Sequence, residues 1–238
     1  MISSLQNPKV KDWMRLHQKK YRVSQYLIFD EVLIEEAFKY GYLDTLIYVG
    51  SLPFDFANAI EVSEEVMMKL TKDEPKPYIG IAHKLEEKPQ EIKKAVLLDD
   101  LQDPHNVGLI LHSAELFGYD TVVLNDNTAD IYHEKCLSAS LGSIYHINVI
   151  KRNLESFIPE LKKDGFKVYA TGLTKETKEL EEVSNSDKFA FVLGNEGSGV
   201  KDEIFALCDE IVKIRMENID SLNVAIAGTI VMYHFASK

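Results

Sequence analysis

The chain has 238 residues, of which 45% are hydrophobic and 27% are charged, a composition that is ordinary for a globular protein long enough to form two packed domains. Its longest apolar run, residues 224–233, is about half of the roughly 20 residues that a transmembrane helix needs, so we expect a buried helix there and no membrane partner. The formal net charge of −11 argues against a nucleic-acid partner unless positive charge is concentrated locally, because phosphate binding relies on Lys and Arg.

The first 27 residues concentrate positive charge in this way. They hold six basic residues and one acidic residue, which gives +5 and leaves −16 for the remainder of the chain. Such segregation is typical of a phosphate-binding face on an otherwise acidic enzyme, with Trp13 and Tyr21 as candidate stacking groups, although a solvated amphipathic helix is the alternative. The basic residues are Lys9, Lys11, Arg15, Lys19, Lys20 and Arg22.

The next elements predict a small α/β unit. Residues 5–20 have a helical pattern, and they are followed by the strand-like "YLIFD", the helical "EVLIEEAFKYG" and the strand-like "TLIYVG". A helix near 63–71 and a strand near 78–82 complete the unit. The stretch "HKLEEKPQEIKK", residues 83–94, is charged and contains a proline, so we place a domain boundary there, between domains of residues 1–88 and 93–238.

From residue 95 onward, apolar runs alternate with helical stretches. The runs lie at 95–101, 121–125, 145–150, 167–172, 188–194 and 210–216. This alternation predicts a largely parallel sheet covered by helices on both faces, in which ligands bind beyond the carboxyl ends of the strands.

The stretch "DPHNVGLILHSAELFG", residues 103–118, predicts a short helix capped by Asp103 and ended by Gly118. His112 does not fall on its apolar stripe but on a neighbouring, more polar face, together with His105, Gly108 and Glu115.

No carboxylate or thiolate set completes a metal site with His105 and His112, and Cys136 and Cys208 lack metal-ligand spacing, so we expect no metal ion. The chain opens with no basic-then-apolar leader, and we expect a reducing cytoplasm.

Two later segments also bring glycines or polar groups to strand ends. In "FVLGNEGSGV", residues 191–200, three glycines in six residues would let the backbone approach a ligand, although a purely structural turn fits equally well. In residues 214–235 a strand leads through a loop to a helix that we expect Asp220 and Ser221 to open. Ser221 and Asn223 would then lie beside a helix N-terminus, which attracts anions, although an ordinary N-cap explains Ser221 nearly as well.

In order and spacing, "DPHNVGLILHSAELFGYDTVVL", "LGNEGSG" and "IRMENIDSLNVAIAG" resemble the three motifs of the SpoU (TrmH) family. These are S-adenosylmethionine-dependent RNA 2'-O-ribose methyltransferases of the SPOUT superfamily. The stretch 2–37 is similar to the L30e-like RNA-binding domain that often precedes the catalytic domain. The resemblance implies a C-terminal trefoil knot, a homodimer with active sites at the subunit interface, and rRNA or tRNA as substrate.

The resemblance also implies site residues. It assigns Asn106, His112, Glu196, Ser221 and Asn223 to the catalytic centre, with His112 standing where the family ordinarily has Arg and Arg215 where it has Pro. The residues expected to hold S-adenosylmethionine are Leu193, Gly194, Asn195, Gly197, Gly199, Ile214, Met216, Leu222 and Asn223.

Three interpretations of His112 stay open at this stage. It acts as a general base or substrate-binding group, it is exposed and incidental, or it marks a site in which catalysis is weak or lost. Arg215 could supply a phosphate contact in place of the family Arg. For the whole protein, one alternative is a non-catalytic RNA-binding protein that keeps the fold. Another is an NAD-linked oxidoreductase, although this chain lacks the G-x-G-x-x-G fingerprint of that class.

Overall fold

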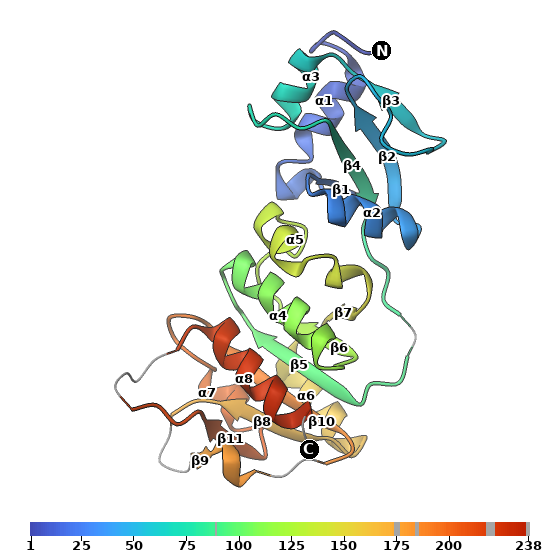
Figure 1. The fold of residues 1–238 in the computed structure, drawn as a ribbon. Helices are drawn as coiled ribbons and strands as arrows, with labels where there is room; N and C mark the ends of the chain where they lie inside the picture. The colour runs from blue at the N-terminus through green and yellow to red at the C-terminus, as the bar shows by residue number, and fades with distance from the viewer. Residues whose placement is uncertain (89, 174–176, 184–185, 218–221, 237–238) are drawn as a thin grey trace.

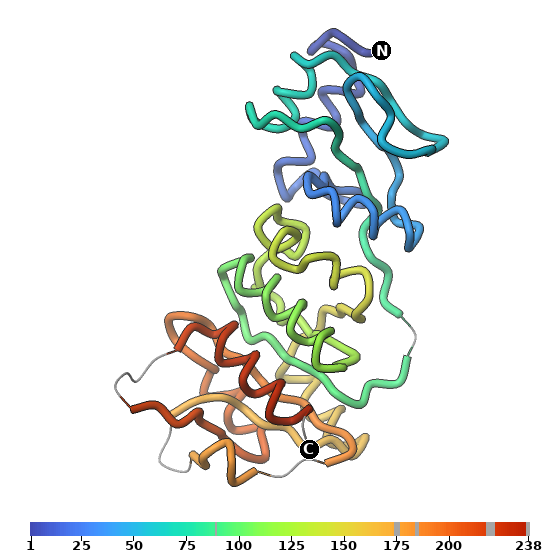
Figure 2. Tube along the Cα trace, in the orientation of Figure 1, coloured from blue at the N-terminus to red at the C-terminus, as the bar shows by residue number. Residues whose placement is uncertain are grey.

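The computed structural model describes residues 1–88, 90–173, 177–183, 186–217 and 222–236. They form two α/β units, one above the other in Figure 1, each built on its own sheet. The connection between the units runs along one side of the molecule (Figure 2).

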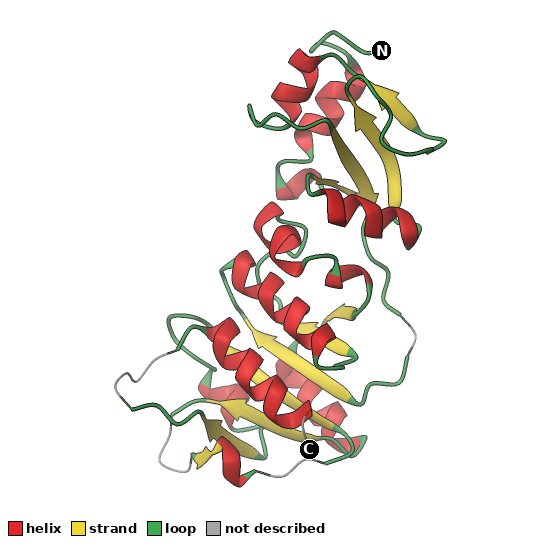
Figure 3. Cartoon of the chain, viewed as in Figure 1, coloured by secondary structure: helices red, strands yellow, loops and turns green. Residues whose placement is uncertain are grey.

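The first unit is a four-stranded sheet with helices on both faces (Figure 3). Its strands are β1 (Gln25–Ile28), β2 (Leu43–Tyr48), β3 (Ala59–Glu61) and β4 (Tyr78–His83), in the order β1-β4-β2-β3, with β4 antiparallel to both neighbours. Side chains of α1 (Pro8–Arg15) and α3 (Glu64–Leu70) pack in one apolar cluster with one face of the sheet, and those of α2 (Glu31–Lys39) pack against the other. The helix predicted over residues 5–20 is therefore shorter, since α1 stops at Arg15 and a separate 3-10 turn, η1, covers Lys19–Tyr21.

The second unit is a seven-stranded sheet in which every neighbouring pair is parallel. This confirms the predicted, mostly parallel α/β sheet. The strand order is β7-β6-β5-β10-β8-β11-β9. β10 therefore lies between β5 and β8, although it follows both of them in the sequence. The strands are β5 (Lys94–Asp99), β6 (Thr121–Leu124), β7 (Asn148–Lys151), β8 (Lys167–Thr171), β9 (Lys178–Glu179), β10 (Phe189–Gly194) and β11 (Glu210–Lys213).

Helices cover both faces of this sheet. On one face, α4 (Pro104–Leu116), α5 (Glu134–Ser140) and α8 (Val224–Ala236) pack in one apolar cluster, to which the 3-10 turns η2 (Ser143–Tyr145) and η3 (Leu180–Glu182) also contribute. On the other face, α6 (Leu154–Lys163) and α7 (Asp202–Phe205) pack against β5, β8 and β10. As predicted, Asp103 caps α4 and Pro104 occupies its first position. Among the described helices, none is long and apolar enough to cross a membrane.

The two units share one hydrophobic core. Tyr26 and Ile28 of the first unit belong to the same buried cluster as Leu137 and Tyr145 of the second, and the Tyr26 hydroxyl donates a hydrogen bond of 2.9 Å to the Tyr145 hydroxyl inside it. Polar contacts flank this core. The Arg22 guanidinium lies 2.6 Å from Asp130 Oδ2, and the His146 ring bridges Glu36 on α2 and Glu115 on α4.

The Arg22–Asp130 ion pair between the units generates a stability prediction. Replacing Arg22 with Met leaves the Asp130 carboxylate without its partner, and breaking such a buried pair costs about 3–5 kcal/mol. The two side chains are 8% and 14% exposed, whereas those of the Arg15–Asp12 pair are 60% and 67% exposed. Arg15→Met should therefore cost at most about 1 kcal/mol. Urea denaturation of both variants measures the loss in free energy of unfolding. Equal losses would show that the Arg22–Asp130 pair stabilises the protein no more than the exposed Arg15–Asp12 pair does.

Candidate functional site

A pocket of about 510 Å³ opens beyond the carboxyl ends of β8, β10 and β11. This edge of a parallel sheet is where the sequence predicts ligand binding. The walls come from residues 171–173, 194–196, 199, 212–214, 216, 222–224 and 227. Seven of the nine residues predicted to hold a cofactor line the pocket, namely Gly194, Asn195, Gly199, Ile214, Met216, Leu222 and Asn223.

The other two predicted cofactor residues do not line the pocket. Leu193 is fully buried, and its side chain packs against Gly228 of α8. Gly197 lies in the loop after β10, where its N–H donates to Asn195 Oδ1. Conversely, the sequence reasoning missed the wall formed by Thr171, Gly172 and Leu173 after β8. The one sequence signal for this wall is its position after a buried strand, since the carboxyl ends of neighbouring parallel strands meet at one edge.

The loop after β10 is a tight turn that requires glycine. A Cβ on Gly194 would lie 2.1 Å from the Val200 nitrogen and 2.2 Å from the Gly199 carbonyl carbon, both backbone atoms. Asn195 and Gly199 exchange backbone hydrogen bonds of 3.0 and 2.9 Å, and Gly199 has a φ of +73°. The Asn195 side-chain oxygen accepts hydrogen bonds from the backbone of Gly197 and Ser198. The turn thus presents backbone groups directly to the pocket.

Glu196 ties this turn to the start of α4. Its carboxylate accepts hydrogen bonds from the Gln102 and Asp103 backbone, both 3.0 Å, and from Asn106 Nδ2 at 3.1 Å. Asn106 Oδ1 in turn accepts a 3.0 Å hydrogen bond from Asn223 Nδ2. Burial raises the pKa of Glu196, but the hydrogen bonds that its carboxylate accepts outweigh burial and lower the pKa below its usual value. Glu196 is therefore a carboxylate at neutral pH.

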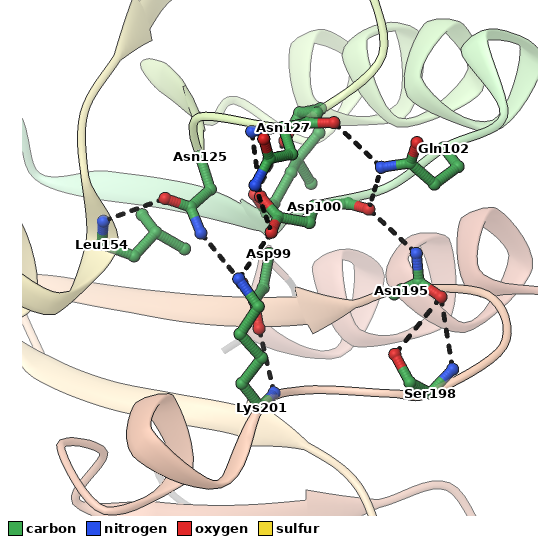
Figure 4. Close-up of polar contacts among 11 residues, drawn as sticks. Asp99, Asp100, Gln102, Asn125, Asn127, Leu154, Asn195, Ser198 and Lys201 are labelled. Carbon is green, nitrogen blue, oxygen red and sulfur yellow. Dashed lines mark hydrogen bonds and ion pairs between the residues drawn. The ribbon is translucent and has the colours of Figure 1, made fainter.

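A second set of contacts holds the same two loops together behind the pocket (Figure 4). Asp99 accepts hydrogen bonds from the Lys201 backbone at 2.9 Å and from Asn125 Nδ2 at 3.0 Å, and Lys201 Nζ lies between the carboxylates of Asp99 and Asp100. The Asp100 carbonyl accepts a 2.9 Å hydrogen bond from Asn195 Nδ2. Burial raises the pKa of Asp100, but the contacts with Lys201 and Asn127 outweigh burial and lower it.

Three of the five predicted catalytic residues meet in one network. Asn106, buried on α4, joins Glu196 and Asn223 through the hydrogen bonds given above. Ser221 lies outside the described residues. The expected start of the last helix at Asp220 and Ser221 is wrong, because α8 begins at Val224 and the Asn223 side chain accepts hydrogen bonds from its first backbone N–H groups, at 2.9 and 3.2 Å. Asn223 is thus an N-cap, which explains an amide ahead of an apolar helix.

His112 lies apart from this network. It follows Asn106 by six residues, or about 9 Å along the helix axis, and its Nδ1 lies 3.1 Å from Ser143 Oγ of η2. The face of α4 that it shares with Gly108 is packed rather than open, since a Cβ on Gly108 would lie 2.4 Å from the Cys136 carbonyl oxygen of α5. Arg215 is exposed on the segment after β11. Within the described ranges, no group of three or more His, Cys, Asp or Glu side chains could hold a metal ion.

The predicted RNA-binding set divides in two. Arg22 is buried, and its guanidinium bonds to Asp130 and to the Leu16 and His17 carbonyls, so we remove it from the set. Trp13 is also a core residue rather than an exposed stacking group. Five basic side chains stay exposed on α1, in η1 or beside them, namely Lys9, Lys11, Arg15, Lys19 and Lys20.

Comparison with known proteins identifies the family. The profile of the SpoU rRNA methylase family matches residues 93–233. The chain belongs to this family. It is 38% identical over 243 residues to the 23S rRNA (guanosine(2553)-2'-O)-methyltransferase RlmP of Bacillus subtilis, with 98% of each chain covered.

Solved structures agree with the assignment to the SpoU family. An S-adenosylmethionine-bound rRNA methyltransferase from Sinorhizobium meliloti superimposes with a TM-score of 0.87 at 28% identity, covering 98% of this chain and 95% of that one. An RNA 2'-O ribose methyltransferase superimposes with a TM-score of 0.82 at 25% identity, covering 98% and 96%. The predicted membership of the SpoU family is confirmed.

The glycine turn offers a matched pair of variants. Gly194→Ala forces a Cβ against backbone that cannot move without opening the turn, so we expect a loss of about 1–3 kcal/mol in stability together with weaker binding of S-adenosylmethionine. At Gly197 the nearest atom to a new Cβ is Asn195 Oδ1 at 3.5 Å, an ordinary contact, so Gly197→Ala should stay close to wild type in both respects. Urea denaturation and titration calorimetry measure the two effects. Similar behaviour of both variants would mean that the turn does not shape the pocket.

Proposed function

We propose that this chain transfers a methyl group from S-adenosylmethionine to a ribose 2'-hydroxyl of 23S rRNA. The observation that carries the proposal is the pocket at the carboxyl ends of β8, β10 and β11, whose wall residue Asn223 bonds to Asn106 and through it to Glu196. The support for the substrate is the relative RlmP, a 23S rRNA 2'-O-methyltransferase that matches along its whole length. We further propose the cytoplasm as its location, where a protein with two unpaired cysteines would meet ribosomal RNA.

The pocket suits S-adenosylmethionine. Its volume of about 510 Å³ lies in the range of small-molecule sites. Gly194 and Gly199 line it with backbone atoms alone, and Ile214, Met216 and Leu222 give it an apolar wall. When bound, the cofactor supplies the methyl group in electrophilic form. The residues proposed to hold it are those of the turn at 194–199 and of the segments 214–216 and 222–224.

The reaction also requires that the ribose hydroxyl be aligned and lose a proton. Glu196 is poorly suited to accept that proton, because its carboxylate already accepts three hydrogen bonds and its pKa is lowered. We assign it, with Asn106 and Asn223, to positioning the turn and the substrate. We propose that His112, which lies apart from the Asn106 network of its own chain, is the proton acceptor or substrate contact of an active site formed at the interface of the proposed homodimer. With Nδ1–H donating to Ser143 Oγ, its Nε2 keeps a lone pair.

We propose Lys9, Lys11, Arg15, Lys19, Lys20 and Arg215 as phosphate contacts for the RNA, since all six are exposed cations.

We also propose that the first unit is an L30e-like domain with the boundary between residues 88 and 93, and that the C-terminal segment forms a trefoil knot. Support for the knot is that β10 inserts between β5 and β8, while α8 returns from β11 to pack on α4. Ser113 of α4 and Thr229 of α8 form a 2.8 Å hydrogen bond there.

We propose a homodimer that pairs through α8. Ile226, Ile230 and Tyr233 are exposed at i, i+4 and i+7 on this helix. The Tyr233 ring lies 5.8 Å from that of Phe117, directly after α4. An apolar stripe of this kind on a helix is typical of a surface that a partner covers.

A methylation assay tests the function directly. The purified chain, incubated with methyl-labelled S-adenosylmethionine and 23S rRNA from cells that lack its gene, should add label at one nucleotide that is then mapped as 2'-O-methylated. Cofactor binding without methylation of any ribosomal RNA would favour the non-catalytic RNA-binding alternative. Absence of both cofactor binding and methylation would sink the proposal.

Two substitutions of His112 test its proposed role. If it accepts the proton, His112→Ala slows single-turnover methylation by about 10²- to 10⁴-fold. His112→Arg should then be inactive, because a guanidinium stays protonated and cannot accept a proton. If His112→Arg is instead fully active, the residue is a positioning cation and the proposed base is wrong.

The α8 stripe gives a test of the dimer. The double variant Ile226→Lys and Ile230→Lys puts two like charges on the proposed interface, so we expect a monomer with little methyltransferase activity. Val32→Lys places the same charge on an exposed apolar position of α2 and should leave the dimer intact. Analytical ultracentrifugation measures the mass of each variant. A parent protein that is monomeric at micromolar concentration would contradict the proposal.

A further inference from the structure

A second cavity lies in the first unit, away from the cofactor pocket. It is an open cavity with a volume of about 390 Å³, bounded by α1, by η1 and by residues of β1, β2 and the start of β3. Its walls combine aromatic, basic and amide or hydroxyl side chains, chiefly Trp13, Arg15, Tyr21, Gln25, Thr45 and Asn58. One carboxylate, that of Asp12, also lines the cavity and lies 3.0 Å from the Arg15 guanidinium. The volume falls within the range of sites for small organic groups.

An exposed aromatic ring stands at one wall of the cavity. Tyr21 is 41% exposed although it is a large side chain, and two cations lie over its ring, with Lys20 Nζ at 4.9 Å and the Arg15 guanidinium carbon at 5.8 Å from the ring centroid. Cations in these positions hold the ring by cation–π attraction. They also place positive charge where a phosphate next to a stacked base would lie.

The opposite wall carries fixed polar groups. Thr45 is buried, and its hydroxyl donates to Asp44 Oδ2 at 2.7 Å and accepts from Asn58 Nδ2 at 2.9 Å. The same Asn58 nitrogen donates to the Asp44 carbonyl at 2.7 Å. Both hydrogen bonds fix the Asn58 amide at the rim of the cavity, with its oxygen as an acceptor, while Gln25 projects from the start of β1. Fixed amides of this kind recognise the hydrogen-bonding edge of a base.

We propose that this cavity binds the base of one unpaired nucleotide of the RNA substrate. The base takes the place of a cation over the Tyr21 ring and stacks there, its edge meets Asn58 and Gln25, and the displaced cation moves to its phosphate. Five exposed cations on α1 and η1, against the single carboxylate of Asp12, favour a polyanion over other aromatic ligands. A base inside a duplex cannot reach such a cavity, so the site selects a bulged or looped nucleotide. The inference rests on the proposed action on RNA and adds a recognition site remote from the methylated ribose.

Trp13 is the single tryptophan of the chain and lines the cavity, so its fluorescence reports occupancy. The full-length protein is titrated with a short RNA hairpin that carries one unpaired nucleotide, in four versions with A, C, G or U. A fifth version has an abasic residue at that place, and a sixth is fully paired. We expect at least one base to give a saturable change that the abasic and paired hairpins do not give.

Variants separate stacking from charge. Tyr21→Ala should weaken the base-dependent change by about 5- to 150-fold, the usual effect of removing one stacked aromatic. Tyr40→Ala is the matched control, because Tyr40 is also an exposed tyrosine with a lysine 5.2 Å over its ring, but it lies directly after α2 and does not line the cavity. Asn58→Ala should alter the preference among the four bases.

Methylation of 23S rRNA, measured on the same preparations, keeps the two proposals distinct. Active enzyme whose Trp13 fluorescence responds to none of the hairpins, or equally to the abasic one, overturns the base-binding cavity and leaves the methyltransferase intact. A base-dependent response that Tyr21→Ala weakens, in a protein that methylates no RNA, supports the cavity and overturns the proposed function. A response that Tyr21→Ala does not change overturns the cavity.

Discussion

The cofactor pocket depends on the attachment of the loop after β10 to the loop after β5. Three carboxylates make this attachment. Glu196 accepts hydrogen bonds from the start of α4, while Asp99 and Asp100 hold the backbone and the ammonium of Lys201. Because β10 lies beside β5 in the sheet, the two loops leave neighbouring strands and need only short side chains to connect them. The attachment of the two loops also places Asn106 within hydrogen-bonding distance of Asn223. The geometry of the site is therefore determined by the adjacent positions of β5 and β10 in the sheet.

The alternation of apolar runs with helical stretches was sufficient to predict the parallel sheet, because a strand that is buried on both faces is a nearly continuous run of apolar residues. Cap chemistry also predicted the bounds of α4 from Asp103 to Gly118. The start of α8 could not be predicted correctly, since Asp220, Ser221 and Asn223 are all good N-caps, and only the contacts of Asn223 show which of them caps the helix. Nor does the sequence show that β10 lies between β5 and β8, because strand order depends on long-range packing.

The candidate site, too, was predicted from the sequence only in part. The resemblance to the SpoU family identified seven pocket residues and the partners Asn106, Glu196 and Asn223, which the structure brings together because they lie at neighbouring strand ends. Residues 171–173 were missed because no special side chain marks them. Arg22 looked equivalent to Lys19 and Lys20, yet its guanidinium pairs with Asp130 in the second unit. A local charge pattern does not reveal a partner that lies more than a hundred residues away.

The core shared by the two units has a consequence for how this chain can be recombined. Arg22, Tyr26 and Glu36 each have their partner in the second unit, at Asp130, Tyr145 and His146. A chimera that joins this first unit to the catalytic half of a relative would therefore bury a guanidinium, a phenol and a carboxylate against side chains that do not match them. To remain folded, such a chimera would have to carry over α5, η2 and the loop that holds Asp130 together with the first unit.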